Sequence, residues 1–347
     1  MRKYLPIILM LLFLSIPASA LEIEAPMVPK AGKELMPEET DSFAEGISGI
    51  FKKSVQILRP DLGEAVRLWV ELIAVVLIIS LLNLCREPAG FVSNLAGAVC
   101  IAVLLLSSAN SMIRLAENTV RQLSDYGKLL FPVMAAGLAA QGGVTASSGL
   151  YLGTTVFSTF LNTLLSGIFL KGIYFYLVLA VASAALGEDV LKRLRDMIKG
   201  AISWTLKILL TAFTTYMSIT GVVSGTTDAA TLKALKVTIS TMVPVVGGIL
   251  SDASESVLVS AALMKNAAGI YGIFALLSLF LGPFLRIGIH YLILKASVLV
   301  CGVFGSKTAV MLIEDFSSAL GLLLAITGSM CMLLLIGTVC FLKGVGG

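Results

Sequence analysis

Long apolar runs recur along this chain and constrain its fold more than any other feature. Runs of about 18 or more apolar residues can cross the roughly 30 Å hydrocarbon core of a bilayer as helices. Hydrophobic residues make up 57% of the 347 residues and charged residues 13%, whereas soluble domains have about 45–50% and about 25%. Candidate spans fall at residues 68–84, 89–110, 129–147, 149–170, 172–186, 201–223, 270–285, 287–304 and 319–342. The sequence predicts an all-α polytopic membrane protein with about nine transmembrane helices.

The first twenty residues have the pattern of a signal peptide. Arg2 and Lys3 give a basic start, residues 5–16 an apolar core, and Ala18-Ser19-Ala20 a cleavage site of small residues. The apolar core is short for a bilayer span, so we expect cleavage after it; an uncleaved first membrane helix is the alternative. The predicted organisation is a signal peptide at 1–20, an exported polar lead and amphipathic helix at 21–67, and a multi-span membrane domain at 68–347.

An amphipathic helix is predicted after the polar, acidic stretch at 21–41. Apolar side chains recur at helical spacing between Phe43 and Leu58, while Lys52 and Lys53 lie on other faces. Such a helix packs on the surface of its own protein, lies on a membrane or meets a partner. Pro60 is expected to end it.

Two apolar segments contain helix breakers. In each, Pro-Val is followed by small residues and then a polar patch, at Pro132 and at Pro244, with Gly247 and Gly248 close behind the second. Non-helical backbone at membrane depth must be buried in protein or line water, so we expect one or two re-entrant or broken helices here. Paired interrupted segments are typical of repeat-built transporters. Ordinary helix packing through small residues is the alternative.

Charged residues within apolar segments are the candidate functional residues. Asp252, Glu255 and Lys265 lie in the second broken segment, and Lys295 lies near the middle of the eighth predicted span. A charge at mid-bilayer costs about 2.5–3.5 kcal/mol on insertion scales, so Lys295 should face water or a carboxylate, with Asp252 or Glu255 as the expected partner. These four residues form a candidate polar route. Alternatively, Asp252 and Glu255 form a helix cap outside the membrane.

Lys and Arg predict the orientation, because short cytoplasmic loops are enriched in both. If residues 237–267 do not cross the membrane, Arg86, the basic loop at 187–200, Arg286 and Lys343 all fall in the cytoplasm, and the loop at 305–315 falls outside. If 237–267 do cross, the last three spans invert.

Motifs for catalysis and cofactor binding are absent from the sequence. His290 is the only histidine and no Cys-x-x-Cys occurs, which argues against a zinc site and against serine or HExxH proteases. No phosphate-binding loop occurs, and the net charge of +4 forms no nucleic-acid footprint. We therefore expect no enzyme, no cofactor, no metal and no nucleic-acid partner.

The stretch from 215 to 269 resembles one family. Its elements SITGVVSG, the two Leu-Lys pairs before VPVVGG, and SDASESVLVSAALMKNAAG are similar to the most characteristic stretch of the stage III sporulation protein AE family. The cleavable signal, the acidic lead and the many-span remainder are similar as well. The resemblance covers most of the mature chain.

This resemblance implies a multi-pass protein of endospore-forming bacteria, in the mother-cell membrane that surrounds the forespore. The implied partners are the other stage III sporulation A-operon proteins and, through them, stage II sporulation protein Q, together with membrane lipid; a homo-oligomer is compatible with it. The implied function is that of a membrane component of the mother cell-to-forespore channel or transport assembly, contributing to a transmembrane route. A non-conducting scaffold that anchors the extracytoplasmic rings of that assembly is the alternative.

Overall fold

The computed structural model describes residues 26–37, 42–84, 90–186, 191–242, 247–304 and 307–343. For residues 221–242 and 247–265 it describes the backbone alone. The predicted signal peptide at 1–20 and Pro244 lie outside the described residues.

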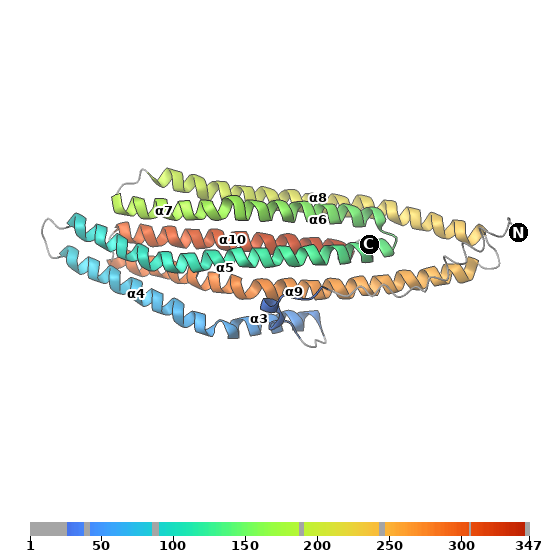
Figure 1. The fold of residues 1–347 in the computed structure, drawn as a ribbon, viewed down its shortest axis with the longest axis horizontal. Helices are drawn as coiled ribbons and strands as arrows, with labels where there is room; N and C mark the ends of the chain where they lie inside the picture. Colours follow the sequence, from blue (N-terminus) through green and yellow to red (C-terminus); the bar gives the residue numbers. More distant parts are fainter. Residues whose placement is uncertain are drawn as a thin grey trace.

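All regular secondary structure in the described ranges is helical, which confirms the predicted all-α class. Figure 1 shows α4, α5, α8, α9, α10 and the continuous rod α6–η1–α7 side by side, with successive rods running in opposite directions. The elements are α2 Lys30–Lys33, α3 Phe43–Ile57, α4 Arg59–Leu84, α5 Gly90–Ala140, α6 Val144–Leu164, the π-helical turn η1 Leu165–Phe169, α7 Leu170–Leu186, α8 Lys192–Met242, α9 Gly247–Phe304 and α10 Lys307–Lys343.

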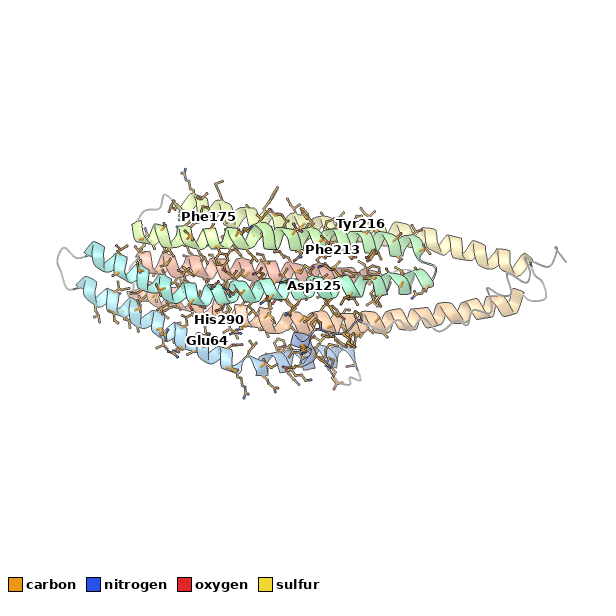
Figure 2. All side chains as sticks on the ribbon, viewed as in Figure 1. Glu64, Asp125, Phe175, Phe213, Tyr216 and His290 are labelled. Atoms are coloured by element: carbon orange, nitrogen blue, oxygen red, sulfur yellow. The ribbon has the colours of Figure 1, made fainter. Side chains whose placement is uncertain are left out.

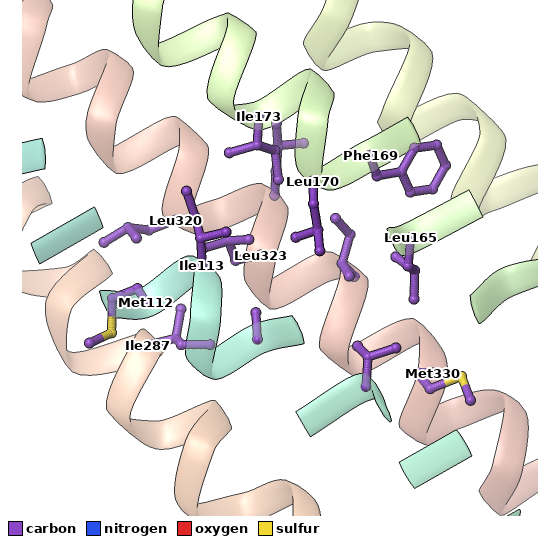
Figure 3. Packing of buried hydrophobic residues seen from close by; sticks show 14 of the residues in the cluster. Met112, Ile113, Leu165, Phe169, Leu170, Ile173, Ile287, Leu320, Leu323 and Met330 are labelled. Carbon is purple, nitrogen blue, oxygen red and sulfur yellow. The ribbon is translucent and has the colours of Figure 1, made fainter. Parts of the chain in front are cut away.

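Helix α10 forms the centre of the bundle. It packs against α5, α6, α7, α8 and α9, and it buries side chains on almost every face. A helix that is hydrophobic all round is stable only when neighbours surround it. Figure 3 shows Leu320, Leu323 and Met330 of α10 among side chains such as Ile113 of α5 and Leu170 of α7.

Small residues let neighbouring helices approach closely. A Cβ atom on Gly153 of α6 would collide with Tyr216 and Met217 of α8. Beside this contact, Phe157 packs edge-on against Phe213 of α8, with 5.3 Å between ring centroids; Phe213 and Tyr216 are labelled in Figure 2. Packing through small residues therefore operates between α6 and α8.

Four helical stretches in the described residues are long and apolar enough to cross a membrane, judged by length and composition: Leu95–Ala140, Val144–Ala185, Asn266–Val303 and Lys307–Lys343. They support a membrane protein, but the predicted count of nine spans is not confirmed. The predicted spans 270–285 and 287–304 both lie on α9, and 149–170 and 172–186 both lie on the rod α6–η1–α7. The sequence pattern treated Arg286 as a loop between two short spans. In the structure Arg286 is one residue within the continuous helix α9.

The chain does not break at Pro132. Helix α5 runs through Pro132 and ends at Ala140, and the chain turns about ten residues later than expected, at residues 141–143. Gly142 has a φ of 88° there, a left-handed conformation that glycine adopts without steric cost. Proline is tolerated inside α5 because neighbouring helices hold the helix where one hydrogen bond is missing.

The helix ends correct the predicted orientation. The ends of α4, α7 and α9 and the starts of α5, α8 and α10 all lie at one end of the bundle, and α10 finishes at the opposite end (Figure 1). Lys192 and Lys307 therefore lie at the same end and Lys343 at the other. The arrangement in which 237–267 do not cross put Lys343 with the 187–200 loop and 305–315 opposite both; it is wrong because it counted α9 as two crossings. The alternative, in which the last three spans invert, places these helix ends as the structure does.

The predicted amphipathic helix is confirmed as α3, and it packs against α9. Ser42 caps it, since its side chain accepts a hydrogen bond from the Glu45 N–H at 3.2 Å. Phe43 stacks on Phe274 of α9 with 5.3 Å between ring centroids. Helix α3 ends at Ile57, just before Pro60 as predicted. Pro60 itself lies in the first turn of α4, where its missing N–H costs no helical hydrogen bond.

Candidate functional site

The predicted route residues do not gather at one place. Asp252, Glu255 and Lys265 are in the helical backbone of α9, and their side chains lie outside the described part of the chain. Lys295 is at least 30 residues further along the same helix, or about 45 Å at 1.5 Å per residue.

Pro244 lies in the sequence between two long helices. Helix α8 ends at Met242, and α9 begins with Gly247 and Gly248. Figure 1 shows these ends of α8 and α9 running past α5, α6 and α10 and approaching each other. We call residues 221–242 and 247–265 the outer hairpin. Each of its halves continues into the bundle as one helix, so it is not a short re-entrant segment.

Lys295 has a carboxylate partner, but a different one from the pair expected. Its Nζ lies 3.9 Å from Glu314 Oε1 of α10, and the two side chains are 40% and 55% exposed. The prediction that Asp252 or Glu255 pairs with Lys295 is wrong, because at least 40 residues of one helix separate each of them from Lys295. That separation is about 60 Å or more.

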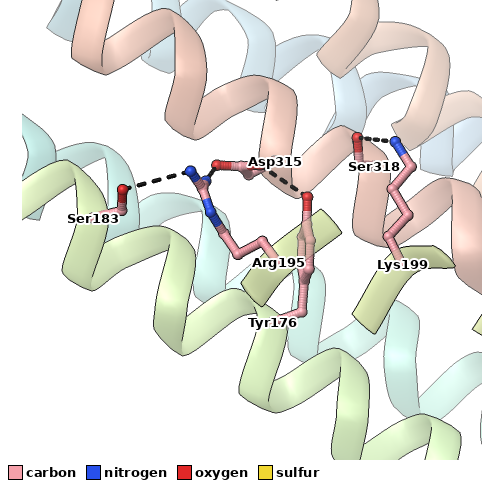
Figure 4. A network of polar contacts seen from close by, with 6 residues as sticks. All are labelled: Tyr176, Ser183, Arg195, Lys199, Asp315 and Ser318. Carbon is pink, nitrogen blue, oxygen red and sulfur yellow. Dashed lines mark hydrogen bonds and ion pairs between the residues drawn. The ribbon is translucent and has the colours of Figure 1, made fainter. Parts of the chain in front are cut away.

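A buried ion pair joins α8 to α10. The Arg195 guanidinium contacts the Asp315 carboxylate, and the two side chains are only 6% and 18% exposed. The Tyr176 hydroxyl of α7 donates a hydrogen bond to Asp315 Oδ1 at 2.9 Å, and Arg195 Nη2 donates to Ser183 Oγ at 3.5 Å (Figure 4). Losing one partner of such a pair leaves an uncompensated buried charge. The pair therefore fixes how α7, α8 and α10 fit together.

Further polar contacts continue across the bundle. Lys199 Nζ donates to Ser318 Oγ at 3.3 Å (Figure 4), and Arg286 Nη2 of α9 lies 3.2 Å from Asp61 Oδ1 and 3.6 Å from Glu64 Oε2 of α4. We call the set the polar belt: Asp61, Glu64, Tyr176, Ser183, Arg195, Lys199, Arg286, Lys295, Glu314, Asp315 and Ser318. It links α4, α7, α8, α9 and α10.

His290 supports the belt from within. It lies one turn after Arg286, is almost fully buried, and donates from its ring Nδ1 to the Arg286 carbonyl oxygen at 3.0 Å. Figure 2 shows His290 on α9 and Glu64 on α4 near this contact. The only histidine therefore holds its own helix and is a structural residue in this arrangement.

Sequence reasoning missed most of the belt. It treated Arg195 and Lys199 as a loop cluster and Glu314 and Asp315 as loop residues outside the membrane. Helical periodicity would have found them, because buried residues three and four apart continue through both segments. These buried residues are Ile202, Leu206 and Leu209 after Arg195, and Leu312, Ile313, Phe316 and Leu320 around Asp315.

Exposed apolar side chains lie on both sides of the belt and also at its level, as Leu292 of α9 and Met197 of α8 do. Toward the α4–α5 connection they include Leu77, Ile78, Leu81, Val99, Val103, Leu299 and Val303, and toward the other end Leu129, Leu152, Val156, Phe160, Ile219, Ile270, Met332 and Val339. A bilayer core covers about 20 helical residues, whereas α5 has 51 and α9 has 58. One bilayer therefore covers only part of this exposed apolar surface.

The fold and the belt define the class: an all-α bundle of membrane-length helices that pairs its interior charges between helices. The sequence model of the family described as Stage III sporulation protein AE matches residues 33–344. The chain belongs to this family, and its role is in sporulation.

One relative shows how far the sequence of this chain diverges within the family. The chain is 25% identical to the Stage III sporulation protein AE of Bacillus subtilis (strain 168) over 202 residues, which cover 56% of this chain and 50% of that protein. The chain thus spans half the length of the curated relative that it matches. No solved structure matches the chain.

Proposed function

We propose that this protein is a membrane component of the mother cell-to-forespore channel or transport assembly required for endospore formation. It sits in the mother-cell membrane around the forespore and works with the other stage III sporulation A-operon proteins and, through them, stage II sporulation protein Q. Family membership supports the sporulation role, and four membrane-length apolar helices support the membrane location.

The observation that carries the proposal is the polar belt within an exposed apolar surface that is longer than one bilayer. Since one bilayer covers only part of this surface, the rest requires a protein cover, and large exposed apolar surfaces mark such interfaces. Charged members of the belt are also exposed, with Glu64 at 69% and Glu314 at 55% of the side chain. Charges of this kind face water or another protein at membrane depth. Both features are those of one chain in a larger assembly.

A transmembrane route in this proposal runs between chains. Helix α10 fills the centre of the bundle with buried residues such as Leu323, Ile326 and Met330. The route passes the outer hairpin, which carries Asp252, Glu255 and Lys265, and then the exposed Lys295 and Glu314 of the belt. Its energy comes from a gradient or a partner, because the chain holds no nucleotide-binding motif.

The orientation follows from the basic end of the bundle. Lys192, Arg193 and Lys307 lie at the helix ends near the α7–α8 and α9–α10 connections, and cytoplasmic ends are enriched in Lys and Arg. This end is therefore cytoplasmic in our proposal, and the outer hairpin points away from the cytoplasm.

A non-conducting scaffold is the second candidate, and the outer hairpin favours it. Helices α8 and α9 run past the rest of the bundle (Figure 1), which offers a rigid attachment point for extracytoplasmic rings. A packed centre and a projecting hairpin are also what an anchor requires.

Cysteine scanning of the full-length chain distinguishes the two candidates. The five native cysteines are first replaced, and single cysteines are then placed through residues 243–266, at the exposed Leu292 and Leu299, and at the buried control Leu276. A membrane-impermeant thiol reagent is applied from outside. Labelling along one face of α9 that reaches Leu292 supports a route.

Labelling all round the outer hairpin that stops before residue 266 supports the scaffold instead. Membership of the assembly is tested separately by deleting the gene. Cells without it that complete forespore development at the normal rate contradict both candidates.

A further inference from the structure

A cavity of about 200 Å³ lies between α5, α10 and the junction of α6 and α7. Its floor is apolar, made of Ala116, Val120, Leu165, Leu170 and Ile326, all of them buried. Its polar lining comes from Glu117 and Arg121 of α5 and Asn162 of α6. None of these residues belongs to the polar belt, and none was among the predicted route residues.

The cavity owes its shape to the π-helical turn η1. Residues five apart in an α-helix point about 140° apart, since it has 3.6 residues per turn. Here Leu165 and Leu170 lie five apart, at the two ends of η1, and both line the same cavity. Figure 3 shows them with Phe169 at this widened turn. Single π turns occur frequently at functional sites.

The two charged groups at the cavity are left without protein partners. Glu117 and Arg121 are four residues apart on α5, a spacing that places Cβ atoms about 5–6 Å apart and favours an ion pair. Yet neither side chain forms a hydrogen bond or ion pair with any residue in the described ranges, and both side chains are exposed at the mouth of the cavity. On α4 the same spacing gives Arg67 and Glu71 an ion pair of 2.9 Å.

We infer that this cavity binds a small zwitterion, with an anionic group at Arg121, an ammonium group at Glu117 and an aliphatic portion over the apolar floor. The two unpaired opposite charges, one turn apart, match such a ligand, and a ligand with one charge leaves the other side chain unpaired. The volume limits the ligand to a few heavy atoms, because cavities for drug-sized molecules have about 300–1,000 Å³.

Two sources supply this chemistry, namely a free α-amino acid or the head group of an ethanolamine phospholipid. The site stands whether the chain conducts or only scaffolds. Its test therefore needs no transport measurement.

The test is calorimetric titration of the full-length protein in detergent. The probes are L-alanine, glycerophosphoethanolamine, and the singly charged propionate and ethylamine. We expect one or both zwitterions to bind saturably and the singly charged probes to bind at least roughly tenfold more weakly, the loss expected when one charge-assisted hydrogen bond is removed. Glu117→Gln and Arg121→Gln should each weaken binding of the zwitterion by a similar factor.

The matched control is the Arg67→Gln/Glu71→Gln pair on α4, which has the same spacing and does not line the cavity. Circular dichroism of each variant establishes that it folds. Binding of L-alanine assigns the site to free amino acids, and binding of glycerophosphoethanolamine alone assigns it to lipid head groups. Binding of neither zwitterion, or equal binding by Arg121→Gln and the unaltered chain, overturns the inference.

Discussion

Helices α10 and α8 are both long, yet they meet the bundle in different ways. Helix α10 is surrounded by five other elements and buries residues on nearly every face. Helix α8 meets the bundle through one stripe of buried residues spaced three, four or seven apart: Arg195, Ile202, Leu206, Leu209, Phe213 and Met217. Its other faces expose side chains such as Met197, Trp204 and Ile219.

This difference between the helices predicts that substitutions on α10 change the stability of the bundle, whereas substitutions on the uncovered faces of α8 change its interactions. Interiors are packed as densely as organic crystals, so a change almost anywhere on α10 alters packing. A change on the uncovered faces of α8 leaves the bundle intact and alters only what covers them. The Arg195–Asp315 pair joins the two helices, and there the buried stripe of α8 carries a charge into the surface of α10.

The largest effect is expected from Asp315→Asn. The substitution keeps the shape and leaves the buried Arg195 without a counter-charge, which should cost about 3–5 kcal/mol of unfolding free energy. The measurement is reversible unfolding of the full chain in mixed micelles. The neighbouring Glu314→Gln is the control; because Glu314 is 55% exposed, it should cost less than about 1 kcal/mol.

The double variant Arg195→Met/Asp315→Leu sharpens this result. It removes both charges, so most of the lost stability should return. An equal loss of unfolding free energy for Asp315→Asn and Glu314→Gln would mean that water reaches the Arg195–Asp315 pair. The pair would then no longer support the contrast between α8 and α10.

The second effect compares the two helices directly. Leu323→Ala on α10 removes a fully buried side chain and should cost about 2–5 kcal/mol, because it opens a cavity. Ile219→Ala on α8 removes a side chain that is 59% exposed and should stay within about 0.5 kcal/mol. Both are measured by the same unfolding experiment. Similar costs at the two positions would show that another chain buries Ile219 as firmly as the bundle buries Leu323.

The third effect tests a place where α8 is held closely against α6. Gly153→Ala adds a Cβ that collides with Tyr216 and Met217, and overpacking of this kind should cost about 1–3 kcal/mol. Gly200→Ala is the matched substitution on α8, where nothing lies within 4 Å. It should be neutral or stabilise by up to about 1 kcal/mol, because alanine favours a helix. A harmless Gly153→Ala would show that α6 and α8 separate easily.

The sequence predicted what depends on local periodicity. Apolar runs predicted an all-α membrane-type chain, and the spacing from Phe43 onward predicted α3, whose contact with Phe274 follows from its apolar face. Local sequence patterns failed where the fold depends on whether a helix continues through a charged residue. An apolar run interrupted by Arg286 is the same whether the chain turns there or continues as one helix. In the structure α9 continues through Arg286, which pairs with Asp61 on α4.

The candidate site shows the same limit. The need of Lys295 for a carboxylate was predictable from its apolar surroundings, and Glu314 meets it. The identity of the partner was not predictable, because it depends on the antiparallel register of α9 and α10, which side chains far apart in the sequence determine. The Arg195–Asp315 pair was missed for the same reason.

The smallest effect concerns Trp204, which is 67% exposed on the uncovered side of α8. Trp69 and Trp204 are the only tryptophans, so Trp69→Phe leaves Trp204 as a single fluorescent reporter. That substitution should be mild, since Trp69 Nε1 has no hydrogen-bond partner in the described residues. Tryptophan is enriched at membrane interfaces, so bromination of the lipids should quench Trp204 strongly, while Trp204→Phe should change stability by less than about 0.5 kcal/mol.

Strong quenching by aqueous acrylamide with no effect of brominated lipid would contradict this expectation and place Trp204 in water. Protection from both quenchers has a different consequence. It would mean that another chain covers α8, so that α8, like α10, is enclosed on every side once the protein is assembled.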